Sequence, residues 1–171
     1  MKYIKFLFII TLVTGLTSCE KNRYPEIENS ANAQFTRTGA TGTAAGPYNS
    51  LALSKANPAV TDQFLLKVVE SGNVQSISVM VDYRKAATPT VTTYSQKYAD
   101  ITTWPQTYTT SLTALTTLFA SNGVTSANVA VGDRFVFRIV ITLKSGTVIS
   151  EQSALLNTAP YAITLTYTVA A

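Results

Sequence analysis

Apolar and polar side chains alternate residue by residue in three segments of this 171-residue sequence. In residues 74–83 the apolar face consists of Ile77, Val79, Val81 and Tyr83. Successive side chains of a β-strand point to opposite faces, so this segment predicts a half-buried strand. Residues 133–143 and 161–169 have the same period, and residues 133–143 are apolar enough on both faces to predict a central strand.

Turn residues extend the β prediction to a hairpin. The sequence Lys144-Ser145-Gly146-Thr147 is typical of a turn, so residues 134–143 and 147–153 are expected to pair. Further strand candidates are residues 63–70 and, with weaker patterns, 97–103 and 107–110. Residues 39–50 are rich in glycine, alanine and threonine and indicate a long loop or irregular edge, and the pattern leaves the strand order in residues 34–62 open.

A single short helix is expected over residues 111–121. Ser111 or Thr110 can cap its N-terminus, and Asn122-Gly123 supplies residues that end helices. Its apolar face consists of Leu112, Leu115, Leu118 and Phe119. Many short strands separated by turns, with one short helix, predict a mainly β fold, an immunoglobulin-like antiparallel β-sandwich.

The start of the sequence matches a bacterial lipoprotein signal. Lys2 and Lys5 precede an apolar run over residues 6–16, and Leu16-Thr17-Ser18-Cys19 places small residues before a cysteine. We expect residues 1–18 to be removed and Cys19, the only cysteine, to carry lipid. Several acyl chains on one cysteine attach a protein lastingly to a membrane. The sequence therefore predicts a lipid-anchored protein of the cell outer membrane, facing either the surface or the periplasm.

The competing interpretation of this start is a transmembrane helix that stays in the chain. The apolar run is shorter than the ~20 residues that cross a bilayer, and two threonines and a glycine interrupt it, which favours a cleaved signal. Residues 19–33 are polar, contain Pro25 and lack periodicity, so they predict a flexible tether. Residues 34–171 are then expected to form one domain.

Charge and composition exclude several classes of function. The sequence has 13 basic and nine acidic residues, and loss of Lys2 and Lys5 with the signal lowers the net charge from +4 to +2. The remaining charges are scattered, so nucleic acid is not an expected partner. There is no histidine and no cysteine besides Cys19, so the usual proton shuttle, transition-metal ligands and thiol nucleophile are missing. We expect no cofactor, no metal and no enzymatic activity.

Three stretches carry a resemblance to a known group of proteins. They are LTSC at residues 16–19, the block of residues 110–150 with its helix, Gly-Asp pair, Phe-rich strand and Gly-containing turn, and YAITLTYTV at residues 161–169. Together they resemble small Bacteroidota outer-membrane lipoproteins associated with starch-utilisation-like, TonB-dependent uptake systems. The resemblance covers about half of the mature chain and assigns no binding residue. It implies an immunoglobulin-like sandwich on a lipid anchor, with an accessory role and a polysaccharide or an uptake complex as partner.

The charge pattern after the cysteine departs from this group. Its surface-exported members often carry an acidic run at that place, whereas Glu20-Lys21-Asn22-Arg23 has mixed charge. The resemblance therefore implies residence at the outer membrane without settling display at the cell surface.

Four aromatic residues form the candidate ligand-binding group. They are Tyr94, Tyr98, Trp104 and Tyr108, in a Thr-rich region around the only tryptophan. Aromatic faces stack on sugar rings, and the side chains of Gln96, Asp100 and Gln106 nearby can bind hydroxyls. The same spacing also suits cross-strand packing pairs and a core tryptophan beneath a loop, and this packing interpretation is the one that we favour.

Two charged residues near the central strand are further candidates for ion-binding sites. Gly132-Asp133 could mark a cation site, but no further acid lies nearby in sequence, so a turn explains the pair better. Arg138 on an apolar strand could mark an anion site, although an arginine stem commonly crosses apolar surface with its head in water, which is our preferred interpretation. No GxSxG motif is present and no acid pair, such as Asp82 with Glu151, is singled out, so no catalytic residue is assigned.

These observations lead to three functional hypotheses. The first is a non-catalytic, lipid-anchored outer-membrane accessory protein that binds a glycan or a partner of a nutrient-uptake system. The alternative is a structural or envelope protein-interaction lipoprotein with no glycan ligand. The least favoured is a small carboxylate-based hydrolase, because a sandwich of this size offers little room for a deep cleft.

Overall fold

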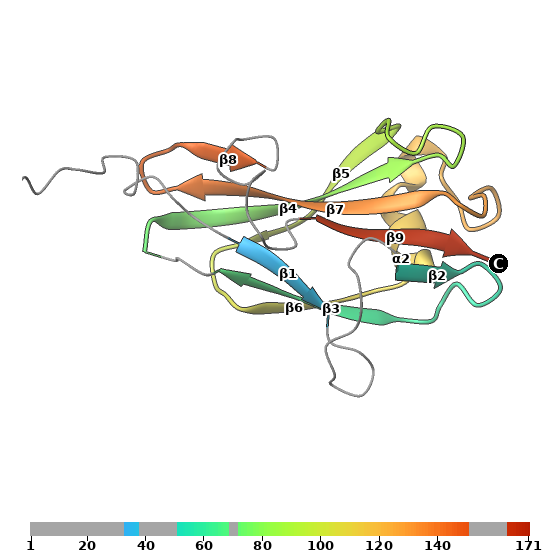
Figure 1. Cartoon of the computed structure of the whole chain (residues 1–171), viewed down its shortest axis with the longest axis horizontal. Helices are drawn as coiled ribbons and strands as arrows, with labels where there is room; N and C mark the ends of the chain where they lie inside the picture. The colour runs from blue at the N-terminus through green and yellow to red at the C-terminus, as the bar shows by residue number, and fades with distance from the viewer. Residues whose placement is uncertain (1–32, 38–50, 69–71, 151–163) are drawn as a thin grey trace, which may run out of the picture.

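The computed structural model describes residues 33–37, 51–68, 72–150 and 164–171. Two β-sheets pack against each other, and a short helix lies beside them towards one end, so the predicted mainly β sandwich is confirmed (Figure 1). The expected signal, the 39–50 loop and almost all of the expected tether lie outside the described residues. The immunoglobulin-like form of the sandwich stays a prediction.

The smaller sheet has three antiparallel strands in the order β1-β3-β6. They are β1 (Ala33–Arg37), β3 (Asp62–Val68) and β6 (Gln106–Thr110). The larger sheet has the order β2-β9-β7-β4-β5, and β8 also pairs with β7. Its strands are β2 (Leu51–Ser54), β4 (Val74–Arg84), β5 (Tyr94–Ile101), β7 (Arg134–Leu143), β8 (Val148–Ser150) and β9 (Thr164–Ala170). Strands β2 and β9 are parallel, and the other described pairs are antiparallel.

The alternating side chains of the strands form the core between the two sheets. Val79 and Val81 of β4 and Phe137 of β7 are fully buried. Across the sandwich the ring of Phe64 on β3 meets Phe137 edge to face, with centroids 4.9 Å apart. The alternation predicted for residues 74–83 and 133–143 is therefore confirmed, because the apolar side chains of one sheet meet those of the other.

The hairpin after β7 is confirmed as well. Strands β7 and β8 pair antiparallel with Ile141 opposite Ile149. Gly146 has φ +85°, a conformation that glycine adopts without the strain that a Cβ would bring. Residues 151–153, which complete the expected hairpin, lie outside the described residues.

The expected helix forms α2 (Leu112–Leu118) and a following 3-10 turn, η2 (Ala120–Asn122). Ser111 is the N-cap, and its hydroxyl accepts a hydrogen bond from the Ala114 N–H at 3.1 Å. Gly123 ends η2 with φ +76°. Leu112 and Leu115 are buried, so the apolar face of the helix closes one end of the core.

Other elements differ from the sequence prediction. Strands β1 and β2 lie in the segment of residues 34–62, for which the sequence pattern predicts no strand order. Strand β1 begins at Ala33, the last residue of the expected tether. Strand β5 begins at Tyr94, ahead of the expected residues 97–103, because Tyr94 pairs with Tyr83 of β4. Further along, the β4–β5 register shifts and Tyr98 has no residue opposite it, which is a β-bulge.

Candidate functional site

The structure does not bring the four candidate aromatic residues together. Tyr94 is the first residue of β5, and Trp104 follows the last residue of that strand, Ile101. A strand rises about 3.3 Å per residue, so β5 alone separates Tyr94 from Ile101 by roughly 23 Å. The four residues therefore cannot form a single sugar-binding platform.

Tyr98 and Tyr108 belong to the packing of the core. Their rings meet edge to face at 5.6 Å, and the ring of Tyr98 lies 5.1 Å from that of Phe137. The hydroxyl of Tyr98 donates to the carbonyl oxygen of Thr109 at 3.2 Å. Burial raises the pKa of both tyrosines above the ordinary value. These two residues therefore match the packing interpretation rather than the binding one.

Trp104 lies at the end of the sandwich where β1 begins. It lines a hollow of about 270 Å³ with Lys67, Val68 and Pro105, and it packs against the edge of the core. Val68 is the register partner of Ala33, the first residue of β1, so the chain enters the sandwich beside Trp104. Trp104 is half-buried, so it lies at the margin of the core rather than within it.

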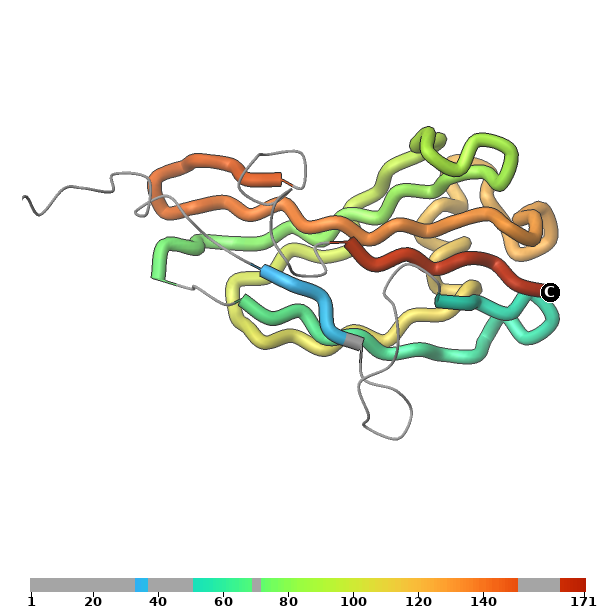
Figure 2. The backbone as a smooth tube through the Cα atoms, viewed as in Figure 1, coloured from blue at the N-terminus to red at the C-terminus, as the bar shows by residue number. Residues whose placement is uncertain are grey.

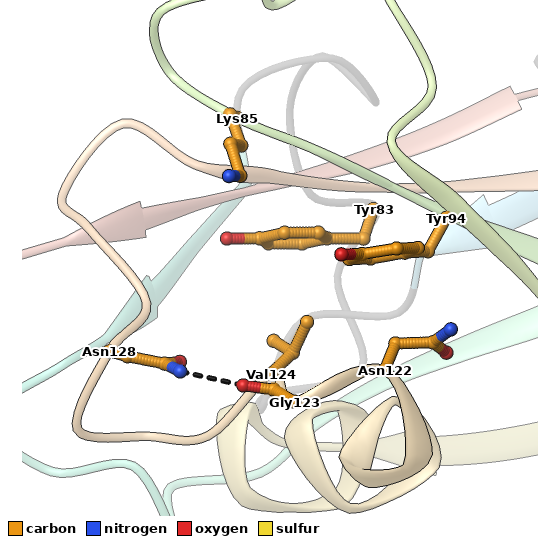
Figure 3. Close-up of a pocket in the computed structure, with 7 residues that line it drawn as sticks. All are labelled: Tyr83, Lys85, Tyr94, Asn122, Gly123, Val124 and Asn128. Atoms are coloured by element: carbon orange, nitrogen blue, oxygen red, sulfur yellow. Dashed lines mark hydrogen bonds between the residues drawn. The ribbon is translucent and has the colours of Figure 1, made fainter.

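Tyr94 lines a different hollow, of about 250 Å³, which we call the tyrosine hollow. Its lining residues are Tyr83, Lys85, Tyr94, Asn122, Gly123, Val124 and Asn128. Tyr83 and Tyr94 are register partners, and their rings are nearly parallel, 7° apart in orientation, with centroids 6.3 Å apart. Figure 3 shows the two rings side by side, with Lys85 on one side of them and Asn122, Val124 and Asn128 on the other.

The position of Tyr83 is fixed from within the core. Its hydroxyl donates to the carboxylate of Asp133, and its ring lies 5.3 Å from that of Phe135. Burial, together with the nearby Asp133 carboxylate, raises the pKa of Tyr83 well above its ordinary value. Tyr83 is therefore neutral at physiological pH, and its ring supplies a rigid wall to the tyrosine hollow.

Opposite the two tyrosine rings, amide side chains line the tyrosine hollow, and hydrogen bonds fix their orientations. The Oδ1 of Asn122 accepts from the Gln96 side chain at 2.8 Å. Asn128 donates from Nδ2 to the Gly123 carbonyl at 2.6 Å, and its Oδ1 accepts from the Thr125 N–H at 2.7 Å. Figure 3 draws the contact between Asn128 and Gly123. Within the described part of the chain no partner is found for the Asn122 Nδ2, so this donor remains for a ligand.

The tyrosine hollow lies far from the point where β1 begins. Strand β5 runs between the Trp104 end and the Tyr94 end of the sandwich. In Figures 1 and 2 the chain enters β1 away from the end at which α2 and the C-terminal end of β9 lie. Ligand contacts at Tyr94 are therefore separated by roughly the length of β5 from the start of β1.

Asp133 and Arg138 both differ from a simple surface role. Gly132 and Asp133 belong to the predicted turn, in which the Asp133 N–H donates to the Ala130 carbonyl oxygen at 3.1 Å. Asp133 is only 3% exposed, and its carboxylate accepts from Tyr83 and from the N–H groups of Ala130 at 2.9 Å and Ala86 at 2.8 Å, so it also holds a second loop. Arg138 Nε donates to the buried Asp82 at 3.2 Å. The Arg138 head group therefore does not lie free in water, because Asp82 of the neighbouring strand β4 lies on the same outer face of the sheet and forms an ion pair with it.

Sequence reasoning missed most of the tyrosine hollow. It assigned Tyr83 to the core and Asn122-Gly123 to the helix end, and it did not consider Lys85 or Asn128. One signal in the sequence could have indicated the pair: Tyr83 ends one strand candidate and Tyr94 lies shortly before the next. Aromatic residues commonly pair across neighbouring strands. Among the residues described, no three His, Cys, Asp or Glu side chains come close enough to hold a metal ion.

Comparison with known proteins does not assign a family. No protein-family model matches the chain, and no curated protein shows a significant match to its sequence. In the described part of the chain no helix has the length and apolar character needed to span a membrane. The function is therefore argued from the geometry of the site and from the sequence.

Proposed function

We propose that this protein is a non-catalytic, lipid-anchored protein of the outer membrane that holds a single sugar unit of a glycan in the tyrosine hollow. The observation that carries the proposal is the pair of parallel rings of Tyr83 and Tyr94 facing the amide side chains of Asn122 and Asn128. An accessory role in nutrient uptake is the context in which such binding is useful.

The chemistry of the tyrosine hollow suits a sugar ring. A sugar presents C–H groups on its faces and hydroxyls around its rim, so it matches an aromatic wall combined with amide donors and acceptors. The hollow of about 250 Å³ is smaller than the ~300–1,000 Å³ pockets that take drug-sized ligands. One sugar unit of a longer glycan therefore suits it better than an extended segment.

The lining residues also support binding without catalysis. Lys85 and the two tyrosines are the titratable groups among them, and no lining residue is a carboxylic acid. A glycosidase ordinarily needs two carboxyl groups flanking the scissile bond. Asp133 lies behind Tyr83 and is occupied by three hydrogen-bond donors.

The anchor is proposed from the sequence. The basic start, the short apolar run and Leu16-Thr17-Ser18-Cys19 support lipidation of Cys19, as does the resemblance to small Bacteroidota outer-membrane lipoproteins. Metabolic labelling with a radioactive fatty acid tests it. The wild-type protein is expected to incorporate label and to sediment with membranes, and Cys19→Ala to incorporate none. Equal labelling of both proteins would contradict the anchor.

Affinity electrophoresis through gels that contain neutral polysaccharides tests the sugar site. We expect a polysaccharide to retard the detergent-solubilised protein, and Tyr94→Ala to abolish the retardation because it removes one ring of the pair. Trp104→Ala is the matched control, since it removes a half-buried aromatic side chain at the other end of β5. Equal loss in both variants, or no retardation of the wild-type protein by any polysaccharide, would refute the sugar site and favour an envelope protein-interaction role.

A further inference from the structure

A second hollow lies on the outer face of the larger sheet, where β4, β5 and β7 are adjacent (Figure 1). It has a volume of about 390 Å³, and we call it the arginine hollow. Its lining residues are Asp82, Arg84, Thr90, Thr92, Ser95, Arg138 and Ser150. All seven have polar side chains and four carry hydroxyls, so the chemistry differs from that of the tyrosine hollow.

A buried carboxylate organises the arginine hollow. Asp82 is 5% exposed, although the alternation of β4 places it on the outer face. Its Oδ1 accepts from Arg138 Nε at 3.2 Å, and its Oδ2 accepts from the Thr92 hydroxyl at 3.1 Å. Arg138 also donates from its second guanidinium nitrogen to Ser95 Oγ at 3.2 Å. Arg138 therefore fixes the Asp82 carboxylate and the edge of β5 in one arrangement.

Arg84 makes weaker polar contacts with the described residues than Arg138 does. Its Nη2 lies 3.6 Å from Asp82 Oδ2, which is an ion-pair distance but too long for a good hydrogen bond. Its Nε is buried and has no hydrogen-bond partner among the described residues. A buried donor without a partner is costly, so such a group is commonly satisfied by a ligand or an ion.

The charges of the lining residues do not cancel. Arg84 and Arg138 supply two positive charges and Asp82 supplies one negative charge. We infer that the arginine hollow binds a sugar acid, with the carboxylate of the ligand on Arg84 and the ligand hydroxyls among the threonine and serine side chains. A guanidinium matches the geometry of a carboxylate, and Arg84 is the arginine whose Nε has no hydrogen-bond partner among the described residues.

The same electrostatics disfavour a more highly charged ligand. A phosphate dianion would place two negative charges near the Asp82 carboxylate, which already lies in the hollow, and like charges repel. The hydroxyl-rich lining would also leave a small carboxylate such as acetate with few polar contacts. A monoanionic, polyhydroxylated ligand therefore fits better than either.

The arginine hollow is distinct from the tyrosine hollow. Tyr83 and Arg84 are consecutive in β4, and Tyr94 and Ser95 are consecutive in β5, so the members of each pair point to opposite faces of the sheet. The inference thus does not rest on the proposed binding of a neutral sugar.

Titration of isotope-labelled protein by NMR tests the inference, with sodium glucuronate, glucose, sodium acetate and inorganic phosphate as probes. The detergent-solubilised protein with Tyr94→Ala is used, so that binding in the tyrosine hollow does not contribute. We expect glucuronate to shift the signals of residues that line the arginine hollow in a saturable way. Glucose, acetate and phosphate are each expected to bind at least tenfold more weakly, because each lacks either the charge or the hydroxyls that the lining matches.

Two arginine variants separate the site from general attraction by charge. Arg84→Gln is expected to weaken glucuronate binding about tenfold to a hundredfold, the usual effect of losing hydrogen bonds to a charged group. Arg134→Gln is the matched control, because Arg134 is the register partner of Arg84 but is exposed and does not line the hollow. Equal losses in the two variants would overturn the inference. So would equal affinity for glucose and glucuronate, or the absence of any saturable shift with glucuronate.

Discussion

Replacement of Asp133 is expected to loosen both the fold and the tyrosine hollow. Its carboxylate accepts from the hydroxyl of Tyr83 and from the N–H groups of Ala86 and Ala130, and it is almost fully buried. Asp133→Ala removes all three hydrogen bonds at once. The loop residues Ala86 and Ala130 are exposed, so water can satisfy their N–H groups, whereas the Tyr83 hydroxyl is left in the core.

The size of the effect follows from these three contacts. A hydrogen bond to a charged group contributes about 1.5–3 kcal/mol, and rehydration of the two loop N–H groups recovers part of their share. We therefore expect Asp133→Ala to lower the free energy of unfolding by about 3–4 kcal/mol, or the melting temperature by about 10 °C. Tyr83→Phe removes one donor and should cost about 1.5–2 kcal/mol.

A double-mutant cycle in urea isolates the contact between the two side chains. In the Asp133→Ala protein, the further change Tyr83→Phe should be neutral or stabilising, because it removes the hydroxyl that the first change leaves unpaired in the core; the coupling free energy is then at least about 1.5–2 kcal/mol. Asp100→Asn is the control, because Asp100 is an exposed aspartate whose partners Ser78 and Lys97 lie on the surface, and its effect should stay within about 1 kcal/mol. Additive effects of the Tyr83 and Asp133 changes would refute this account of the contact.

Two further predictions concern alkaline pH and the end of the helix. Burial raises the pKa of Tyr83, Tyr98 and Tyr108, so the stability from their neutral forms is present below pH ~10 and lost as pH rises beyond it. The urea midpoint should fall between pH ~9 and ~11, and an unchanged midpoint would count against buried hydroxyls. Gly123→Ala should cost about 1 kcal/mol because its φ is +76°, whereas Gly72→Ala, in equally open space without a positive φ, should be neutral or slightly stabilising. Equal urea midpoints for the two variants would contradict this.

The strands and the helix follow from local patterns in the sequence. The alternation in residues 74–83 fixes which side chains of β4 meet the core, and the hydroxyl of Ser111 is a local N-cap. The pairing of β2 with β9 could not be foreseen, because Leu51 and its partner Tyr167 lie far apart in sequence and no local signal joins them. Parallel pairing also lacks the tight turn that sets the register of a hairpin.

The candidate site was predicted less well, for a related reason. Tyr94 is one of the predicted candidates and lines the tyrosine hollow, whereas its partner Tyr83 is expected in the core, and the register of the two depends on how β4 and β5 pair. Asp82 was expected on the solvent side of β4, where it does lie, yet Arg138 from β7 and Thr92 from the β4–β5 connection cover it. Alternation predicts the face of a strand on which a side chain lies, and only the tertiary arrangement decides what then covers it.

The separation between the start of β1 and the tyrosine hollow has a consequence for an anchored molecule. If lipid holds the segment before Ala33, the end of the sandwich that carries Trp104 lies nearer the bilayer, and the end that carries Tyr94 lies farther from it. The paired rings of Tyr83 and Tyr94 would then lie on the side of the domain away from the lipid headgroups. A long polymer lying parallel to the membrane would then be bound at a distance from the bilayer of at least about the length of β5.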